Sequence, residues 1–203
     1  MTSRATNSDP ERMLSVLKAQ MAADGVTHLL VQFVDVHGAA KVKLVPAGEF
    51  RTAIDTGAGF AGGAVWGLGQ GPHSHDLCAR VDPDTYTLLP CEPSVARFAA
   101  NLYVDGHPHP YCPRVNLGRI LDTARDRGDS FQVGIEPKFF LAVRNPDGSI
   151  APWDPNGVDD LAKPCYDFKA MTCALGFFRA LQDALNTLSW GAYQAGHEDA
   201  NGQ

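Results

Sequence analysis

From Phe131 to Val143 the sequence reads FQVGIEPKFFLAV, and its apolar residues largely occupy every second position. This alternation predicts a β-strand, because successive side chains of a strand point to opposite faces. Glu136 and Lys138 would then project together from the face opposite the apolar one. A carboxylate held on a strand can ligate a divalent cation, whereas an exposed Glu–Lys pair has little consequence. The pattern alone leaves both interpretations open.

The flanking segments predict helices and further strands. The longest amphipathic pattern runs from Tyr166 to Leu188, and a second helix follows Pro113, with Asn116 as its cap and Gly128 at its end. Near the N-terminus, Asp9 and Pro10 begin a helix that Gly25 stops. Further strands are predicted at residues 28–36 and 39–46 as a hairpin, and at 85–89, 99–104 and 189–195. The mixture predicts the α+β class.

Composition and charge exclude several classes of protein. The 203 residues carry 17 Lys and Arg against 23 Asp and Glu, a net charge of −6, which argues against a nucleic-acid-binding surface. No run approaches the roughly 20 apolar residues of a membrane span, and the N-terminus has no apolar signal core. The five cysteines form no C-x-x-C pair, so a disulfide framework is unsupported. We therefore expect a soluble, cytoplasmic protein without nucleic-acid or membrane partners.

Two loop motifs admit a functional and a structural interpretation. Residues 57–62 match G-x-G-x-x-G, but more glycine follows where a dinucleotide fold needs a helix, so we favour a mobile loop. The His73/His75/Asp76 and His107/His109 groups contain metal-binding residue types, yet neither has further ligands at a familiar spacing. Histidines of surface loops are the more common outcome.

The last residues form an acidic, turn-rich cluster. His197, Glu198 and Asp199 precede Asn201-Gly-Gln203, and a segment containing Trp190 and Tyr193 leads into them. A solvated tail is the simpler interpretation. The apolar segment before the cluster favours a functional site instead.

Taken together, these segments resemble the glutamine synthetase superfamily, specifically its GlnT-like, type III group. The resemblance rests on Gly134-Ile-Glu-Pro-Lys-Phe-Phe-Leu141, on Lys163-Pro-Cys-Tyr-Asp167 and above all on residues 190–203, WGAYQAGHEDANGQ. It implies an N-terminal β-grasp-like domain at residues 1–112. Residues 113–203 would be the beginning of a glutamine synthetase catalytic α/β domain, truncated at Gln203.

The resemblance also implies a reaction and its site residues. Such enzymes join glutamate to ammonia through a γ-glutamyl phosphate, using ATP and Mg²⁺ or Mn²⁺, in nitrogen metabolism and glutamine biosynthesis. Glu136 and Glu198 match metal-binding carboxylates of the family, and Lys138 occupies the usual position of a second carboxylate. By position, Asn201, Gly202 and Gln203 would lie beside the glutamate site. Asp76 is the alternative residue for the amine site, because Ala61 stands where an aspartate is often found.

Two alternative functions remain open at this stage. The acceptor amine could be methylamine instead of ammonia, and a non-catalytic, oligomerising or regulatory paralogue would explain Lys138. Since family members form ring-shaped oligomers, we expect the complete protein to be a homo-oligomer. We also expect that the reading frame continues past Gln203 and that residues 1–203 cannot catalyse alone.

Overall fold

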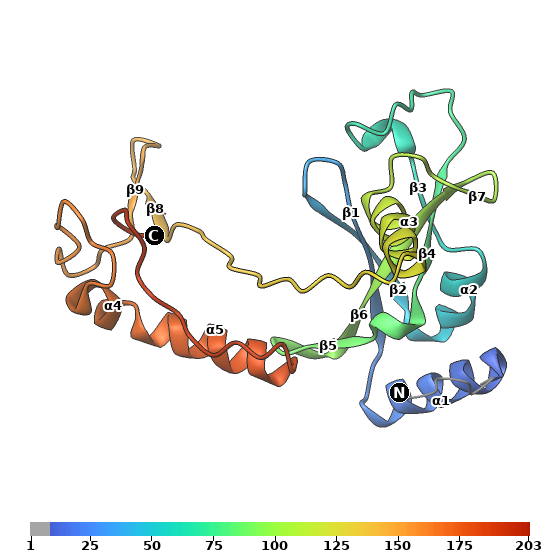
Figure 1. The fold of residues 1–203 in the computed structure, drawn as a ribbon, viewed down its shortest axis with the longest axis horizontal. Helices are drawn as coiled ribbons and strands as arrows, with labels where there is room; N and C mark the ends of the chain where they lie inside the picture. Colours follow the sequence, from blue (N-terminus) through green and yellow to red (C-terminus); the bar gives the residue numbers. More distant parts are fainter. Residues whose placement is uncertain (1–8) are drawn as a thin grey trace. The chain divides into compact units, whose positions relative to one another are not determined.

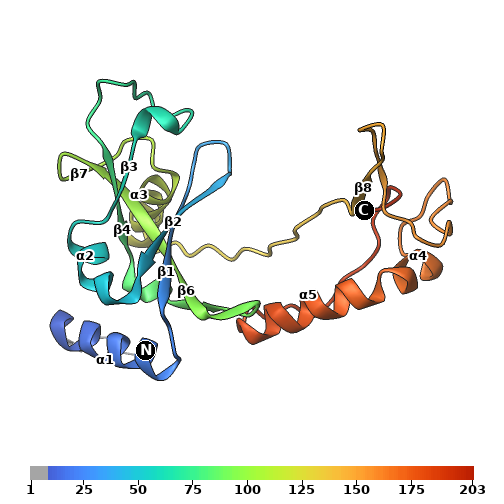
Figure 2. The same cartoon turned by 180° about the vertical axis from the view of Figure 1, so that it is seen from behind.

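The computed structural model describes residues 9–203, and its contacts divide the chain into two compact units, with the boundary in the sequence between Ser130 and Phe131. Residues 1–8, where no secretion signal is expected, lie outside the described part. Figures 1 and 2 show the elements of both units. The mixture of helices and one large sheet confirms the predicted α+β class. Within residues 9–203, no helix has the length and apolarity that crossing a membrane requires.

The first unit is built on one mixed sheet with the strand order β2-β1-β6-β4-β3, and β5 and β7 pair with β6. The central pair β1–β6 is parallel, and the other pairs are antiparallel. The predicted hairpin is confirmed, with His28 opposite Pro46 and Val34 opposite Ala40. The strands are β1 (His28–Val34), β2 (Ala40–Pro46), β3 (Ala58–Phe60), β4 (Leu77–Val81), β5 (Thr87–Leu89), β6 (Glu92–Val104) and β7 (His107–Pro108).

Among residues 9–130, which the structure describes, three α-helices and three short 3-10 helices complete this unit. They are α1 (Pro10–Ala23), α2 (Phe50–Asp55) and α3 (Pro113–Asp126), with η1 (Ala47–Glu49), η2 (Gly62–Ala64) and η3 (Pro83–Thr85). The start of α1 is as predicted, because the Asp9 side chain accepts a hydrogen bond from the Glu11 amide and Pro10 occupies the first turn. Gly25, with a φ of +73°, follows the helix as expected.

The core lies on one face of the sheet, where alternate residues of its strands are buried. Phe98 of β6 contacts Phe50 of α2, with their ring centroids 5.4 Å apart, and α1 adds Met21. The strand residues of this core are Leu29, Val31 and Phe33 of β1, Leu77, Ala79 and Val81 of β4, and Ala96, Phe98, Ala100 and Leu102 of β6. Burial of these apolar side chains is the main stabilising contribution to this unit.

Helix α3 begins three residues before the predicted cap. Cys112 is its N-cap residue and Pro113 occupies the first turn, while the Asn116 side chain donates to the carbonyl oxygen of Pro110 (2.8 Å). The prediction of Asn116 as N-cap was wrong, because proline is pre-organised for the first helical position and sets the start. Gly128, with a φ of +84°, ends the helix as predicted.

Helix α3 packs with the first unit, because it contacts β1 and β6. The predicted domain boundary between residues 112 and 113 stays a prediction.

The glycine-rich motif at residues 57–62 is ordered structure and not the expected loop. Residues 58–60 form β3, which pairs with β4, and the 3-10 turn η2 follows. A Cβ atom on Gly57, whose φ is +85°, would lie 2.7 Å from the carbonyl oxygen of Ala79. Close backbone approach explains that glycine. The α-helix that a dinucleotide site would need does not follow the motif.

The second unit contains less regular structure than the sequence predicts. Its elements are β8 (Ala142–Arg144), β9 (Ile150–Pro152), α4 (Phe168–Cys173) and α5 (Leu175–Thr187). Near-continuous helices α4 and α5, interrupted at Ala174, replace the single predicted helix. The strand predicted at residues 189–195 is not formed, and residues 131–141 form no strand either.

The segment 131–141 departs most from its prediction. It is drawn as a plain trace without an arrow (Figure 2), and only its continuation, β8, forms a ladder, with β9. Val133 and Ile135 are 78% and 85% exposed, although their parity predicts burial. A strand forms only where another strand completes its backbone hydrogen bonds. Within the described residues, no strand pairs with this segment, although its last residue, Leu141, makes backbone hydrogen bonds with Gly202 and Trp153.

Candidate functional site

A charged cluster in the second unit joins the two predicted metal-binding segments. The ammonium Nζ of Lys138, from segment 131–141, lies 2.5 Å from Oε1 of Glu198 in the C-terminal turn. Glu136 also acts electrostatically on Lys138, so both predicted metal carboxylates share this ammonium as a charged neighbour. Residues 60 positions apart in the sequence therefore meet at one point.

The two partners of this ion pair stabilise each other's charged form. The hydrogen bond with Glu198 raises the pKa of Lys138, despite some desolvation, and the charge of Glu136 acts in the same direction. The same hydrogen bond lowers the pKa of Glu198. Near neutral pH the site therefore holds a carboxylate and an ammonium in direct contact.

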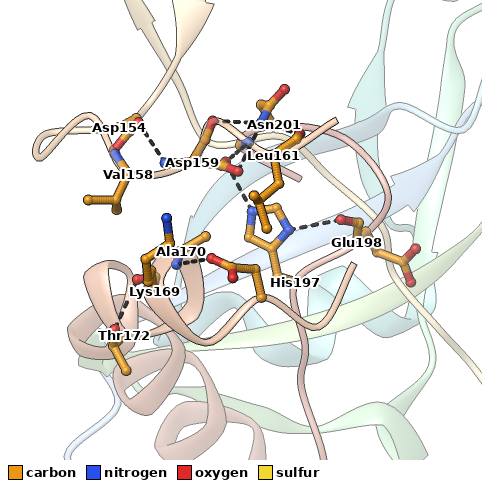
Figure 3. Close-up of polar contacts among 12 residues, drawn as sticks. Asp154, Val158, Asp159, Leu161, Lys169, Ala170, Thr172, His197, Glu198 and Asn201 are labelled. Carbon is orange, nitrogen blue, oxygen red and sulfur yellow. Dashed lines mark hydrogen bonds and ion pairs between the residues drawn. The ribbon is translucent and has the colours of Figure 1, made fainter. Parts of the chain in front are cut away.

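Asp159 organises the C-terminal turn that carries Glu198 (Figure 3). Its carboxylate accepts hydrogen bonds from the Gly202 amide (2.5 Å) and from Nδ2 of Asn201 (3.0 Å), and it lies 3.0 Å from Nε2 of His197. The side chains of Asp159 and His197 are each only 6% exposed. Burial acts to raise the pKa of Asp159, but the hydrogen bonds from Gly202, Asn201 and His197 together lower it below its ordinary value.

His197 connects this buried carboxylate to the backbone of Glu198. Its Nδ1 atom lies 2.8 Å from the carbonyl oxygen of Glu198, while Nε2 faces Asp159, as Figure 3 shows. Each ring nitrogen of His197 thus lies beside a hydrogen-bond acceptor. The backbone of His197 also accepts a hydrogen bond from the Tyr166 amide (3.0 Å). The main chain at Glu198 is thereby fixed from two sides.

The predicted substrate-binding residues take part in the same turn. Asn201 donates to the backbone oxygen of Asp159 (2.6 Å) as well as to its carboxylate. The Gly202 carbonyl oxygen accepts a hydrogen bond from the Leu141 amide (2.7 Å), and Gln203 accepts one from the Glu198 amide (3.0 Å). Gly202 has a φ of +78°, and a Cβ atom there would lie 2.9 Å from the oxygen of Leu141. These contacts hold the turn together, and a role beside glutamate stays a prediction.

Asp159 is the residue that the sequence interpretation missed. It lies in the loop of residues 155–164, for which no periodicity or motif predicts a partner. The available signal is the Asp159-Asp160 pair inside a loop rich in proline and glycine. Asp160 is 70% exposed while Asp159 is buried, so the pair itself does not reveal which residue is structural.

The remaining candidates belong to the first unit. Asp76 is exposed and directly precedes β4, and its assignment to an amine site stays a prediction. His75 pairs with Asp105 (2.6 Å) at the surface. His109 is buried, which lowers its pKa, and its Nδ1 lies 3.2 Å from the Tyr111 amide nitrogen.

Divalent cations are only partly matched by this donor set. Carboxylate oxygens of Glu136 and Glu198 are the ligand type that Mg²⁺ and Mn²⁺ prefer. However, within residues 9–203 no three His, Cys, Asp or Glu residues come together as a metal site. One of the two carboxylates is moreover already paired with Lys138. The described residues therefore do not form a complete metal site by themselves.

Comparison with known proteins places this geometry in a family. No family model matches the chain. A glutamate–methylamine ligase of Methyloversatilis universalis is 44% identical over 179 residues, which cover 88% of this chain and 40% of the relative. A glutamine synthetase of Rhizobium meliloti is 36% identical over the same shares of the two proteins. The chain belongs to the glutamine synthetase superfamily.

Solved structures of this superfamily share the fold. The structure of GmaS in complex with ADP matches with a TM-score of 0.78 and 34% identity, covering 92% of this chain and 42% of that protein. The predicted membership of the superfamily is thus confirmed. The chain spans about 40% of the length of these curated relatives.

Proposed function

We propose that this chain belongs to an ATP-dependent ligase of the glutamine synthetase type, which joins glutamate to a small amine. The observation that supports this proposal most strongly is the similarity to ligases of the superfamily over 88% of the chain. The 44% identity with a glutamate–methylamine ligase, against 36% with a glutamine synthetase, favours methylamine over ammonia as the acceptor. ATP and glutamate as substrates favour a cytoplasmic enzyme.

The proposed reaction has two chemical steps. An oxygen of the glutamate γ-carboxylate attacks the γ-phosphorus of ATP, which forms γ-glutamyl phosphate and releases ADP. The amine nitrogen then attacks the acyl carbon, loses a proton and displaces inorganic phosphate. Both steps place negative charge close together, which bound Mg²⁺ or Mn²⁺ would offset.

Each candidate residue has a proposed role in this scheme. Glu136 and Glu198 would contribute carboxylate ligands to a cation site that residues outside this chain complete. Asp76 would contact the amine, and the turn of residues 201–203 would lie beside glutamate. Asp159 and His197 would act as positioning residues, because they fix the backbone that carries Glu198.

A non-catalytic paralogue is the second candidate. The observation that favours it is the Lys138–Glu198 contact, which engages a proposed metal carboxylate. Such a protein would retain the fold and the family's proposed homo-oligomeric assembly without turning over ATP.

Turnover by purified protein tests the proposal. Phosphate release would be measured with ATP, Mg²⁺, glutamate and either methylamine or ammonia. The assay would use residues 1–203 alone, the same chain with the downstream half of a superfamily ligase supplied in trans, and a single polypeptide joining the two. We expect turnover only when both halves are present, and faster with methylamine.

Two variants of the joined polypeptide sharpen the test. Glu198→Gln should abolish turnover, whereas Glu92→Gln, in the first unit, should leave turnover unchanged. Absence of amine-dependent turnover in the joined polypeptide would favour the paralogue, and turnover by residues 1–203 alone would refute the expectation of incompleteness.

A further inference from the structure

The charge balance at Glu198 is unusual for a carboxylate that is expected to bind a metal ion. Glu198 contacts the ammonium of Lys138, and the charge of Glu136 also acts on that ammonium. At 2.5 Å from Oε1, the ammonium occupies coordination space of Glu198 that a cation would require. A magnesium–oxygen distance is about 2.0–2.1 Å, so a metal ion on the same oxygen would lie close to the ammonium, and the two positive charges would repel each other.

We propose that Lys138 acts as an internal cation at Glu198, and that a divalent metal ion binds this carboxylate only by displacing the Lys138 ammonium. This inference rests on the proposed function in one respect, namely that Glu136 and Glu198 are the metal carboxylates. It adds that this chain carries a competitor for that site. The expected consequence is weak binding of divalent cations, tuned by residue 138.

The position of Glu198 supports competition instead of independent binding. Its backbone is fixed by hydrogen bonds at His197 and Gln203, so the carboxylate cannot move away from Lys138 together with its main chain. His197 adds a second favourable electrostatic contribution at Glu198. A divalent ion arriving there would meet an ammonium that is a compact point charge.

The mobility expected of Lys138 makes displacement feasible. Its side chain is 50% exposed and is carried by the segment 131–141, which lacks strand partners among the described residues. A lysine has four flexible carbons and can swing its charge into water. The pair is therefore a competitor that can be released, and not a permanent block.

Direct measurement of Mn²⁺ binding to the joined polypeptide, in which the proposed cation site would be complete, tests the inference without any turnover. The variants are Lys138→Met, which removes the charge and keeps a long side chain, and Lys138→Arg, which keeps the charge. Lys169→Met is the matched control, because Lys169 is 54% exposed in the same unit and lies 3.5 Å from Asp160. Free Mn²⁺ would be followed by electron paramagnetic resonance, and circular dichroism would verify that each variant is folded.

We expect Lys138→Met to bind Mn²⁺ at least about tenfold more tightly than the wild type, since removing a neighbouring positive charge favours a divalent ion. Lys138→Arg and Lys169→Met should bind like the wild type. Adding Glu198→Gln to Lys138→Met should abolish the gain. Unchanged or weaker binding by Lys138→Met would overturn the inference, as would an equal gain in Lys169→Met. If Lys138→Met fails to fold, Lys138→Gln replaces it with the same expectation.

The result also separates this inference from the proposed function. One outcome is that the wild type binds Mn²⁺ tightly through Glu198, with an affinity that substitutions of Lys138 do not change. That result would reject Lys138 as a competitor and would keep the assignment of Glu136 and Glu198 as metal ligands. Absence of binding in every variant would reject both the competitor and the assignment of Glu136 and Glu198. Ligase turnover of the joined polypeptide remains a separate measurement.

Discussion

Replacing Asp159 with alanine should loosen the whole C-terminal turn. The substitution removes a carboxylate that contacts His197, Asn201 and Gly202 over 2.5–3.0 Å, and it leaves His197 buried without its charged partner. A hydrogen bond to a charged group contributes about 1.5–3 kcal/mol, and breaking a buried pair costs about 3–5 kcal/mol. Because these contacts share one side chain, their contributions do not add. We expect a loss of about 3 kcal/mol in local stability.

Hydrogen exchange followed by mass spectrometry measures this loss where it occurs. The amides of Leu141 and Tyr166 donate to Gly202 and His197, so their protection reports on closure of the turn. A loss of about 3 kcal/mol corresponds to roughly 100-fold faster exchange when opening and closing are rapid. Peptides from β1 and β2 should exchange at the wild-type rate, because they belong to the other unit.

The adjacent residue provides a matched control. Asp160 is 70% exposed and faces Lys169 at 3.5 Å, so Asp160→Ala should change exchange by less than about threefold. If Asp159→Ala behaved like Asp160→Ala, Asp159 would not organise the turn and the reasoning would be wrong. Faster exchange throughout both units would also refute it, since the effect would then be global.

Two further predictions concern the same turn. Gly202→Ala should destabilise the second unit by about 1–3 kcal/mol in urea unfolding, because its φ is +78° and the new Cβ would lie 2.9 Å from an atom of Pro152. Gly148→Ala is the control, since Gly148 has a φ of +87° but open space around it, and it should destabilise the unit less. Equal losses of stability in the two variants would exclude the steric contribution. The pKa of Asp159 is lowered from 3.8, so its stabilising effect is complete above that pH and is lost as the pH falls through the lower folded value. The wild type should therefore lose more stability than Asp159→Ala in acid unfolding below about pH 4, and parallel curves would show that Asp159 is not the responsible group.

Elements fixed by local chemistry could be predicted from the sequence. The Asp9 cap and Pro10 determine the start of α1 within a few residues, and the hairpin of β1 and β2 follows from two β-rich runs around a turn with Gly38. The strands β5 and β6 were predicted in part, because β6 begins earlier, at Glu92. Strand β4 and helix α2 were missed, since glycine and proline interrupt the pattern around them.

Features that depend on distant partners could not be predicted. The alternation at Phe131–Val143 shows which side chains share a face, but a strand also needs a neighbour, and none of the described strands pairs with residues 131–141. The joint projection of Glu136 and Lys138 from one strand face stays a prediction, because residues 131–141 form no strand. The burial of Asp159 arises from residues about 40 positions away, which no local pattern encodes.

The parallel pairing of β1 with β6 has a consequence for how the first unit folds. The hairpin of β1 and β2 is local and can form early, whereas β6 is synthesised after β1 to β5. Closing this long-range pair costs chain entropy before the burial of Leu29 and Val31 compensates for it. During synthesis the early hairpin therefore presents an apolar face until β6 has left the ribosome. We therefore expect the insertion of β6 between β1 and β4 to be the slow step of folding, during which the nascent chain depends on protection from association.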